Sequence, residues 1–249
     1  MSDIRVLGGA SDAQVLRQER LVDMLRSSPL PANELLHNLG LYLTRQTLSR
    51  VLFMHELYQL IIPVTGIVVE FGVRWGQNLA LLSALRGMYE PYNYNRKIVG
   101  FDTWQGFPAV DAKDGKRVAA GDYGVTRDYM SVLQELLELH EQESPIAHKR
   151  KFELVKGDAT RSFEEYLAKN PQTIVAFAYF DFDIYAPTRR CLELLMERVT
   201  RGTLIAFDEL NCPEFPGETL ALMEVVGLRR FALRRTPNNP LISYLVVDA

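Results

Sequence analysis

The feature that most constrains the fold of this chain is an alternation of short apolar runs with amphipathic segments, which begins at Ile67. This alternation is typical of βαβ units around a parallel sheet. Strands are expected at about residues 67–71, 97–102, 152–156, 173–180 and 203–207. A helix near 217–226 follows, and 229–235 and 241–247 are expected to form a hairpin around turn residues 237–240. The pattern predicts a doubly wound, Rossmann-like α/β sheet, mostly parallel with an antiparallel C-terminal hairpin.

The first 62 residues follow a helical pattern instead, with no evident strand. Ser11 can cap one helix, which carries apolar residues at helical spacing. A second helix would share one face among Leu48, Val51, Leu52 and His55. We therefore divide the chain into an N-terminal helical segment, 1–62, and a Rossmann-like domain, 63–249.

Composition limits the classes of protein to which this chain can belong. Its 249 residues are 47% apolar, which suits one well-cored domain with an appendage. A net charge of -3 provides no basic surface for a nucleic acid, which is not expected as a partner. We find neither a transmembrane stretch nor a secretory leader, and expect a cytoplasmic protein without a membrane partner. Cys191, Cys212 and four scattered histidines lack the spacing of a zinc site.

Parallel sheets bind ligands at the carboxyl ends of their strands, where the strand order reverses. The first predicted strand ends in a turn from Glu70 to Gly76, in which Gly72 and Gly76 let the backbone approach a ligand closely. These glycines could instead serve helix packing alone. Arg74 stands where a dinucleotide fingerprint needs glycine, and Glu70 could bind the cationic amino group of a methionyl moiety. The turn favours a zwitterionic nucleoside ligand over NAD.

Acidic residues also follow the second and third strands. Asp102 is placed to accept hydrogen bonds from ribose hydroxyls, or to cap a turn. Trp104 could cover a bound nucleoside or fill the core. Asp158 could accept a hydrogen bond from the adenine amine, cap the following helix, or do both.

The fourth and fifth strands deliver carboxylates to the same edge of the sheet. Residues 175–180 are apolar on both faces, as a central strand must be, and lead to Asp181 and Asp183. The fifth strand ends in Asp208 and Glu209. Like charges so close raise one another's pKa unless a cation joins them, and oxygen ligands favour magnesium, manganese or calcium. Helix caps and solvated loop acids are the alternative interpretation.

Together these segments resemble the macrocin O-methyltransferase family, antibiotic-pathway enzymes that methylate sugar hydroxyls. The likeness extends from about Thr44 onward and is strongest in 68–76, 100–108, 181–185 with Thr188-Arg189, and Asp208-Glu209. Within the family, the chain looks most like enzymes that 3-O-methylate a nucleotide-linked deoxyhexose of the TDP-rhamnose type. Other members act on a sugar already attached to an aglycone.

The resemblance implies a class I methyltransferase fold, S-adenosylmethionine as methyl donor, and Mg²⁺ or another divalent cation. The implied cofactor-binding residues are Glu70, Gly72, Arg74, Gly76, Asn78, Asp102, Thr103, Trp104, Asp158, Ala159 and Asp181. The implied metal ligands are Asp181, Asp208 and Glu209, although relatives commonly carry Asp-Asp in place of Asp208-Glu209. Asp181 is the implied general base, with Asp183 in reserve. The N-terminal helices resemble the family's lid and oligomerisation segment, so a homo-oligomer is expected.

Methyl transfer from a sulfonium to an alcohol is an in-line displacement. Positioning contributes about 7 to 11 kcal/mol and one general base roughly 10²- to 10⁴-fold in rate, so alignment dominates. An NAD-dependent sugar oxidoreductase and a non-catalytic sugar- or nucleoside-binding module are the competing interpretations. Arg74, Glu70 and the lack of a Tyr-x-x-x-Lys pair disfavour the oxidoreductase. Further candidates for contact with the acceptor are Arg45, Arg50, His55, Tyr58 and Tyr123, of which His55 is more readily a core residue.

Overall fold

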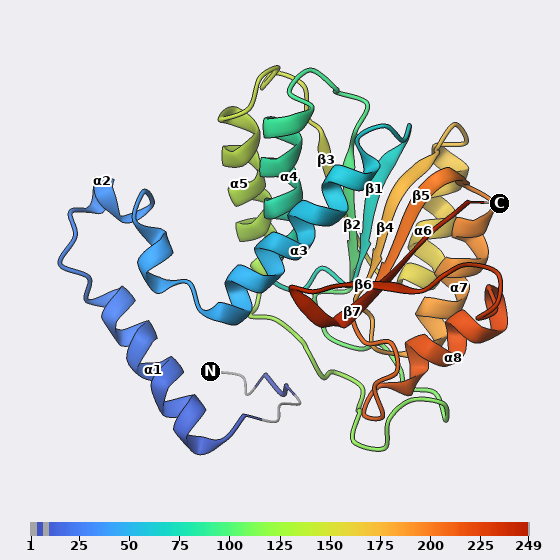
Figure 1. The fold of residues 1–249 in the computed structure, drawn as a ribbon, viewed down its shortest axis with the longest axis horizontal. Helices are drawn as coiled ribbons and strands as arrows, with labels where there is room; N and C mark the ends of the chain where they lie inside the picture. The colour runs from blue at the N-terminus through green and yellow to red at the C-terminus, as the bar shows by residue number, and fades with distance from the viewer. Residues whose placement is uncertain (1–3, 7–9, 249) are drawn as a thin grey trace.

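The computed structural model describes residues 4–6 and 10–248. Its centre is a seven-stranded sheet in the order β3-β2-β1-β4-β5-β7-β6 (Figure 1). Strands β1 to β5 are parallel, and β7 runs antiparallel to both β5 and β6. The strands are β1 Ile67–Phe71, β2 Ile98–Asp102, β3 Phe152–Lys156, β4 Val175–Phe180, β5 Val199–Phe207, β6 Arg234–Thr236 and β7 Asn239–Val246. The predicted doubly wound sheet with an antiparallel C-terminal pair is confirmed.

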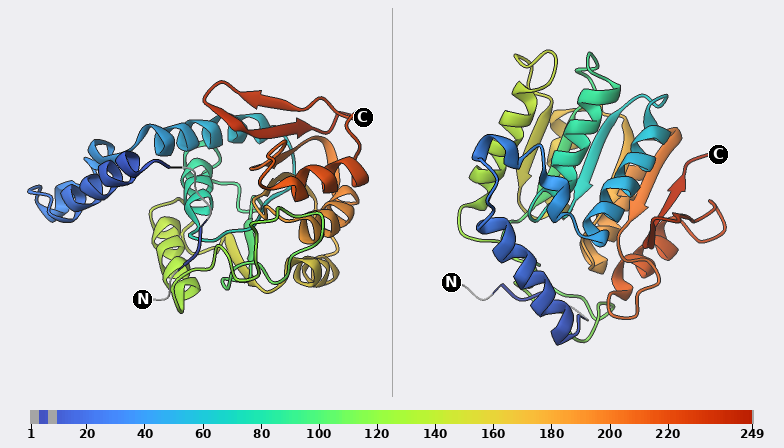
Figure 2. Two further views of the ribbon diagram at one scale, coloured as in Figure 1. Left: turned by 90° about the horizontal axis from the view of Figure 1, so that it is seen from below. Right: turned by 60° about the vertical axis from the view of Figure 1, so that its left-hand side comes forward.

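Helices cover both faces of this sheet (Figures 1 and 2), with α3, α4 and α5 on one face and α6, α7 and α8 on the other. The bounds are α3 Arg45–Ile61, α4 Gln77–Tyr89, α5 Tyr129–Gln142, α6 Ala159–Lys169, α7 Tyr185–Met196 and α8 Pro216–Val225. Every residue of β4 is buried, because this strand lies between both helical layers and between β1 and β5. The strand order reverses at β1, so the ligand crevice of such folds is expected above the ends of β1 and β4.

The C-terminal hairpin differs in extent from the prediction. Residues 229–233 are not a strand, because the chain turns at 228–230 and buries Phe231 against the core before β6 begins. The reversal between β6 and β7 takes only Pro237 and Asn238, since Asn239 already pairs with Thr236. β5 begins earlier than predicted, at Val199, where it pairs with Val175.

The N-terminal helices are α1 Asp12–Arg26, α2 Ala32–Leu35 and the short 3-10 helix η1 Leu39–Tyr42, followed by α3. The backbone N–H of Ser11 donates to Gln14 Oε1 at the start of α1, as a capping residue should. None of the residues of α1, α2 or η1 is buried, and Figure 1 shows α1 and α2 projecting from the body of the molecule. No helix among the described residues combines the length and apolar character that a membrane crossing requires.

Helix α3 belongs to the packed core, but it uses a different face from the one predicted. Its buried residues are Phe53, Met54, Leu57, Tyr58 and Ile61, whereas Leu48 and Leu52 are 46% and 40% exposed. The helix carries apolar residues on two sides, and the sheet covers only one of them. The division of the chain at residue 62 stays a prediction.

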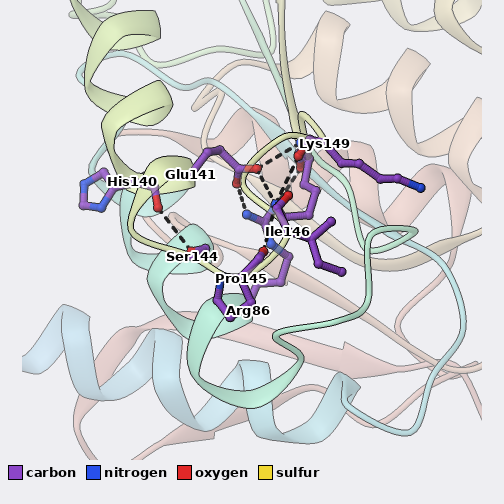
Figure 3. Close-up of polar contacts among 8 residues, drawn as sticks. Arg86, His140, Glu141, Ser144, Pro145, Ile146 and Lys149 are labelled. Carbon is purple, nitrogen blue, oxygen red and sulfur yellow. Dashed lines mark hydrogen bonds and ion pairs between the residues drawn. The ribbon is translucent and has the colours of Figure 1, made fainter.

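Between α5 and β3, a buried ionic network closes the loop that joins them (Figure 3). Glu141 pairs with both Arg86 and Lys151, and all three side chains are at most 5% exposed. Lys151 Nζ also donates to the carbonyls of Ile146 and Lys149, each at 3.1 Å. One carboxylate therefore balances two buried cations, Lys151 directly before β3 and Arg86 on α4.

Replacing Glu141 with Gln should destabilise the fold by about 3 kcal/mol, because it leaves two buried cations without a counter-charge. Denaturant unfolding of the parent and of Glu141→Gln measures the difference. Glu138 lies on the same helix as Glu141 and forms a half-exposed ion pair with Arg150. Glu138→Gln breaks this pair and is the matched control, which should lower the free energy of unfolding by less than about 1 kcal/mol. Equal stability losses in the two variants would contradict the role assigned to the buried network.

Candidate active site

Backbone hydrogen bonds extend the sheet into the turns that follow β1, β4 and β5. Gly72 donates to the carbonyl of Phe101, Asp181 to Phe71 at 2.8 Å, and Asp208 to Phe180 at 3.0 Å. These bonds fix the carboxyl ends of β1, β4 and β5 side by side. A cavity of about 210 Å³ lies over these ends, which is the position predicted from the strand order.

The turn after β1 requires both of its glycines. A Cβ on Gly72 would lie 2.0 Å from the backbone oxygen of Asp181, and one on Gly76 would lie 2.3 Å from the side chain of Leu133. Gly72 lines the cavity, whereas Gly76 begins α4 with a φ of 76° and packs against α5. The packing interpretation therefore holds for Gly76, and close approach at a cavity wall holds for Gly72. Arg74, with a φ of 49°, also lines the cavity.

Glu70 is 1% exposed and does not itself line the cavity. Its Oε1 accepts a hydrogen bond of 2.8 Å from Asn78 Nδ2, while its Oε2 has no hydrogen-bond partner among the described residues. Burial raises the pKa of Glu70 to about 8 against the bond from Asn78 and the charge of Arg50, which lower it. A buried carboxyl with one unpaired oxygen fits a role in holding a cationic amino group.

Asp102 serves as a turn cap and also lines the cavity. Its carboxylate accepts the backbone N–H of Arg74 at 2.8 Å and that of Trp104. Thr103 lines the cavity as well, but Trp104 is 7% exposed and belongs to the apolar cluster under α4 and α5. Of the two interpretations of Trp104, the structure supports core filling.

Asp158 caps a helix and also lines the cavity. Its carboxylate accepts the backbone N–H of Thr160 at 2.9 Å and so caps α6. Asp158, Gly157 and Ala159 form one wall of the cavity.

Four carboxylates line the opposite wall of the cavity: Asp181, Asp183, Asp208 and Glu209. Burial raises the pKa of Asp181 well above its ordinary value, and the charges of Asp208 and Asp183 raise it further. Burial, together with the charges of Asp208 and Glu209, raises the pKa of Asp183 to about 8. The expected mutual effect of clustered carboxylates is therefore present at this edge of the sheet.

Two arginines bring positive charge to this cluster: Arg74 lowers the pKa of Asp183, and Arg50 on α3 contacts Asp208 directly. Its Nη2 lies 3.2 Å from Asp208 Oδ1, and its Nη1 donates to the hydroxyl of Tyr179 at 2.9 Å. The Tyr179 hydroxyl in turn donates to Asp208. Burial lowers the pKa of Arg50, but Tyr179 and the carboxylates more than offset this, so the net shift is upward. Arg50, Tyr179 and Asp208 are therefore joined pairwise by one ion pair and two hydrogen bonds.

The donor chemistry of the acidic wall suits a hard divalent cation, but the arrangement does not form a ready ligand set. Among the described residues, no three His, Cys, Asp or Glu side chains converge as metal ligands would. Asp208 is engaged by Arg50 and Tyr179. The metal role of Asp181, Asp208 and Glu209 stays a prediction.

Sequence patterns alone identified only part of the cavity. Arg50 and Tyr123 line it, whereas Arg45, His55 and Tyr58 do not. His55 is hydrogen-bonded to the hydroxyl of Tyr89, and Tyr58 to Glu90. The lining residues not predicted from the sequence are Gly106, Phe107, Pro108, Gly157, Phe182, Ile184 and Pro187. Apart from Pro187 on α7, these residues lie in the loops that carry the predicted acids, and hydrophobic periodicity does not encode which residues of a loop face a cavity.

Solved structures resemble this chain over nearly its whole length. No protein-family model and no curated protein sequence matches it. The crystal structure of CalS11, a calicheamicin methyltransferase, is 41% identical, with 99% of this chain and 97% of that chain covered and a TM-score of 0.93. An apo structure of CalS11, described as a TDP-rhamnose 3'-O-methyltransferase of calicheamicin biosynthesis, is 39% identical over 98% and 99% of the two chains, with a TM-score of 0.86. The O-methyltransferase NovP, at 18% identity and a TM-score of 0.62 over 81% and 80%, shares the fold.

Glu70→Gln should flatten the dependence of folding stability on pH in the ligand-free protein. The folded pKa of about 8 lies above the ordinary value of 4.5, so the folded state binds this proton more tightly than the unfolded state. Its contribution to stability is complete below pH 4.5 and is lost as the pH rises to about 8. Urea unfolding measures the free energy of unfolding at pH 6 and at pH 8. The decrease between these two pH values should be smaller for Glu70→Gln than for the parent, whereas the exposed control Glu135→Gln should match the parent. Identical losses would contradict the raised pKa.

Proposed function

Because this chain belongs to the family of S-adenosylmethionine-dependent sugar O-methyltransferases that includes CalS11, we propose that it methylates the 3-hydroxyl of a nucleotide-linked deoxyhexose of the TDP-rhamnose type. The observation that carries the proposal is the cavity at the strand-order reversal. It is lined by the carboxylates that follow β4 and β5, in a fold shared along nearly the whole chain. Such relatives give no support to an NAD-dependent oxidoreductase.

In this proposal the cofactor occupies the part of the cavity formed by the ends of β1, β2 and β3. S-adenosylmethionine supplies an activated methyl group on a sulfonium. Glu70, with its unpaired Oε2, would hold the amino group of the methionyl moiety, reached past Gly72. Asp102 keeps lone pairs for ribose hydroxyls beyond the two it uses on backbone N–H groups, and Asp158 would accept from adenine.

Asp181 is the proposed general base at the acceptor end of the cavity. A carboxylate with a raised pKa binds a proton more tightly than an ordinary aspartate and is the better base once ionised. Arg50 and Tyr179 hold Asp208 in place, so that the acceptor meets a fixed acidic wall. Phe107 and Phe182 add apolar surface that excludes water from the reacting hydroxyl.

Magnesium is a further part of the proposal. Asp181, Asp208 and Glu209 would hold it, as the family resemblance implies, and the oxygen donors of the cavity wall support this. Binding would require Asp208 to give up its contact with Arg50. When bound, a divalent cation would orient vicinal sugar hydroxyls.

The N-terminal segment is proposed to cover the acceptor. The loop between β2 and α5 contributes Phe107 and Tyr123 to the cavity. Arg5 lies against this loop: its carbonyl accepts the N–H of Tyr123 at 3.0 Å, and its guanidinium lies 3.4 Å from Asp122. Residues near the N-terminus therefore contact the outer wall of the site, as a lid would.

Asp181→Asn should lower the rate of methyl transfer by about 10²- to 10⁴-fold, because the amide cannot accept the proton. The measurement is product formation by mass spectrometry from S-adenosylmethionine and TDP-rhamnose, with and without magnesium, while calorimetry follows binding of S-adenosylmethionine and NAD. Cofactor affinity should remain measurable in the variant. Asp183→Asn tests the reserve base on the same wall and should lower the rate by a smaller factor than Asp181→Asn.

Near-normal turnover by Asp181→Asn would remove Asp181 as base. Turnover only with rhamnose already attached to an aglycone would show that the acceptor is an aglycone-linked sugar, as in other members of the family. Turnover that does not depend on magnesium would remove the metal from the proposal.

Self-association through the N-terminal segment is proposed from its exposed leucines. Leu16, Leu36 and Leu41 are 65%, 80% and 68% exposed, and a helix of 15 residues such as α1 is marginally stable without tertiary packing. Light scattering after size-exclusion chromatography should report more than one copy for the parent, and fewer for the double variant Leu36→Glu/Leu41→Glu. Leu241→Glu, at 68% exposure on β7, is the control and should leave the mass unchanged. A monomeric parent would contradict this assignment.

A further inference from the structure

Backbone N–H groups from both acid-bearing loops converge on one side chain, that of Glu218. Its Oε1 accepts from Phe182 N at 3.2 Å and from Asp183 N at 3.4 Å, and its Oε2 accepts from Glu209 N at 3.2 Å. Phe182 and Asp183 follow β4, and Glu209 follows β5. A single carboxylate therefore ties together the two loops that form the acidic wall.

Holding a carboxylate at this position is costly. Glu218 is 0% exposed, and among the described residues no basic side chain pairs with it. Burial and the charges of Asp183 and Asp208 raise the pKa of Glu218 well above its ordinary value, and the N–H bonds offset only part of this cost. An apolar side chain would avoid that cost but would leave the loops unattached. The contribution specific to Glu218 is therefore its three hydrogen bonds to the two loops.

The first turn of α8 is built to reach these loops. A Cβ on Gly217 would lie 2.4 Å from Asp114 Oδ1 and 2.5 Å from Tyr185 N, so only glycine permits this approach. Thr219 Oγ1 accepts from Asn211 N at 2.8 Å, which attaches the β5–α8 loop a second time. Asp183 and Asn211 both have positive φ values, 60° and 61°, a backbone conformation that needs support from its surroundings.

We propose that Glu218 is a positioning residue for methyl transfer, which fixes the separation between the loop of Asp181 and Asp183 and the loop of Asp208 and Glu209. The proposal rests on the proposed function in so far as these four acids meet the acceptor. Glu218 itself does not line the cavity. It acts through the backbone of residues that do.

Glu218→Gln tests this role, because glutamine keeps the shape but offers one acceptor oxygen in place of two. Its NH₂ group must face the N–H of one of the two loops, so that loop loses its bond. We expect kcat to fall by about 10- to 100-fold, since misplacement of reacting groups by about 1 Å costs this much. The affinity for S-adenosylmethionine should change by less than about twofold, because its proposed contacts other than Asp181 lie in β1, β2 and β3 or in the segments that directly follow them.

Glu141→Gln is the matched control for loss of stability, because it removes a buried carboxylate charge from α5, outside the cavity lining. It should lower the melting temperature and leave kcat unchanged. Hydrogen exchange measured by mass spectrometry should rise in peptides covering 181–185 and 208–212 in Glu218→Gln, and not in Glu141→Gln. This readout needs no acceptor, so it separates failure of the inference from failure of the proposed function.

Thr219→Val provides a second, milder variant if Glu218→Gln does not fold. It removes only the bond from Asn211 N, and should raise exchange in 208–212 while lowering kcat by a smaller factor. A kcat within about twofold of the parent in a folded Glu218→Gln, or exchange unchanged in both loops, would overturn the positioning role. A parent enzyme without activity on any nucleotide sugar, but with the expected exchange pattern, would overturn the proposed function alone.

Discussion

Gly72 and the backbone carbonyl of Asp181 approach so closely that a Cβ on residue 72 would lie 2.0 Å from the oxygen. This contact is possible because β1 and β4 are hydrogen-bonded neighbours at the point where the strand order reverses. It brings the turn that would hold the cofactor against the loop that carries the proposed base. The other walls of the cavity surround this contact, and a side chain at residue 72 would push the cofactor turn away from the loop of Asp181.

The electrostatics of the site follow from the same convergence of strands. Parallel strands end at one edge, so the acids that follow β4 and β5 share a partly buried space and raise one another's pKa. Arg50 lies on α3, outside the sheet, and supplies a counter-charge to these acids. The hydroxyl of Tyr179 links its guanidinium to Asp208. The acidic wall is therefore held by two elements, α3 on one side and the first turn of α8 beneath it.

The strands and the acids at their ends could be predicted from the sequence, because apolar runs of β-strand length alternate with helical segments and each run is followed by a polar turn. Hydrophobic periodicity could not decide which side of α3 packs on the sheet, since Leu48 and Phe53 lie on two apolar sides of one helix. The contacts of Arg50 and Glu218 were likewise not predictable, because they join residues far apart in the chain. A tyrosine within the apolar β4 run and a glutamate within the apolar α8 were the available signals.

The turn between β6 and β7 holds α3 from the far end of the chain. Asn238 accepts from the hydroxyl of Ser49 through its carbonyl, 189 positions away, and donates through its amide to Glu56, 182 positions away. β7 also completes the hydrogen bonding of β5 along its open edge. Synthesis proceeds from the N-terminus, so Ser49 and Glu56 are made long before Asn238. A nascent chain can therefore pack the apolar side of α3 against α4 before Asn238 is available, and the bonds to Ser49 and Glu56 then fix the part of α3 that carries Arg50.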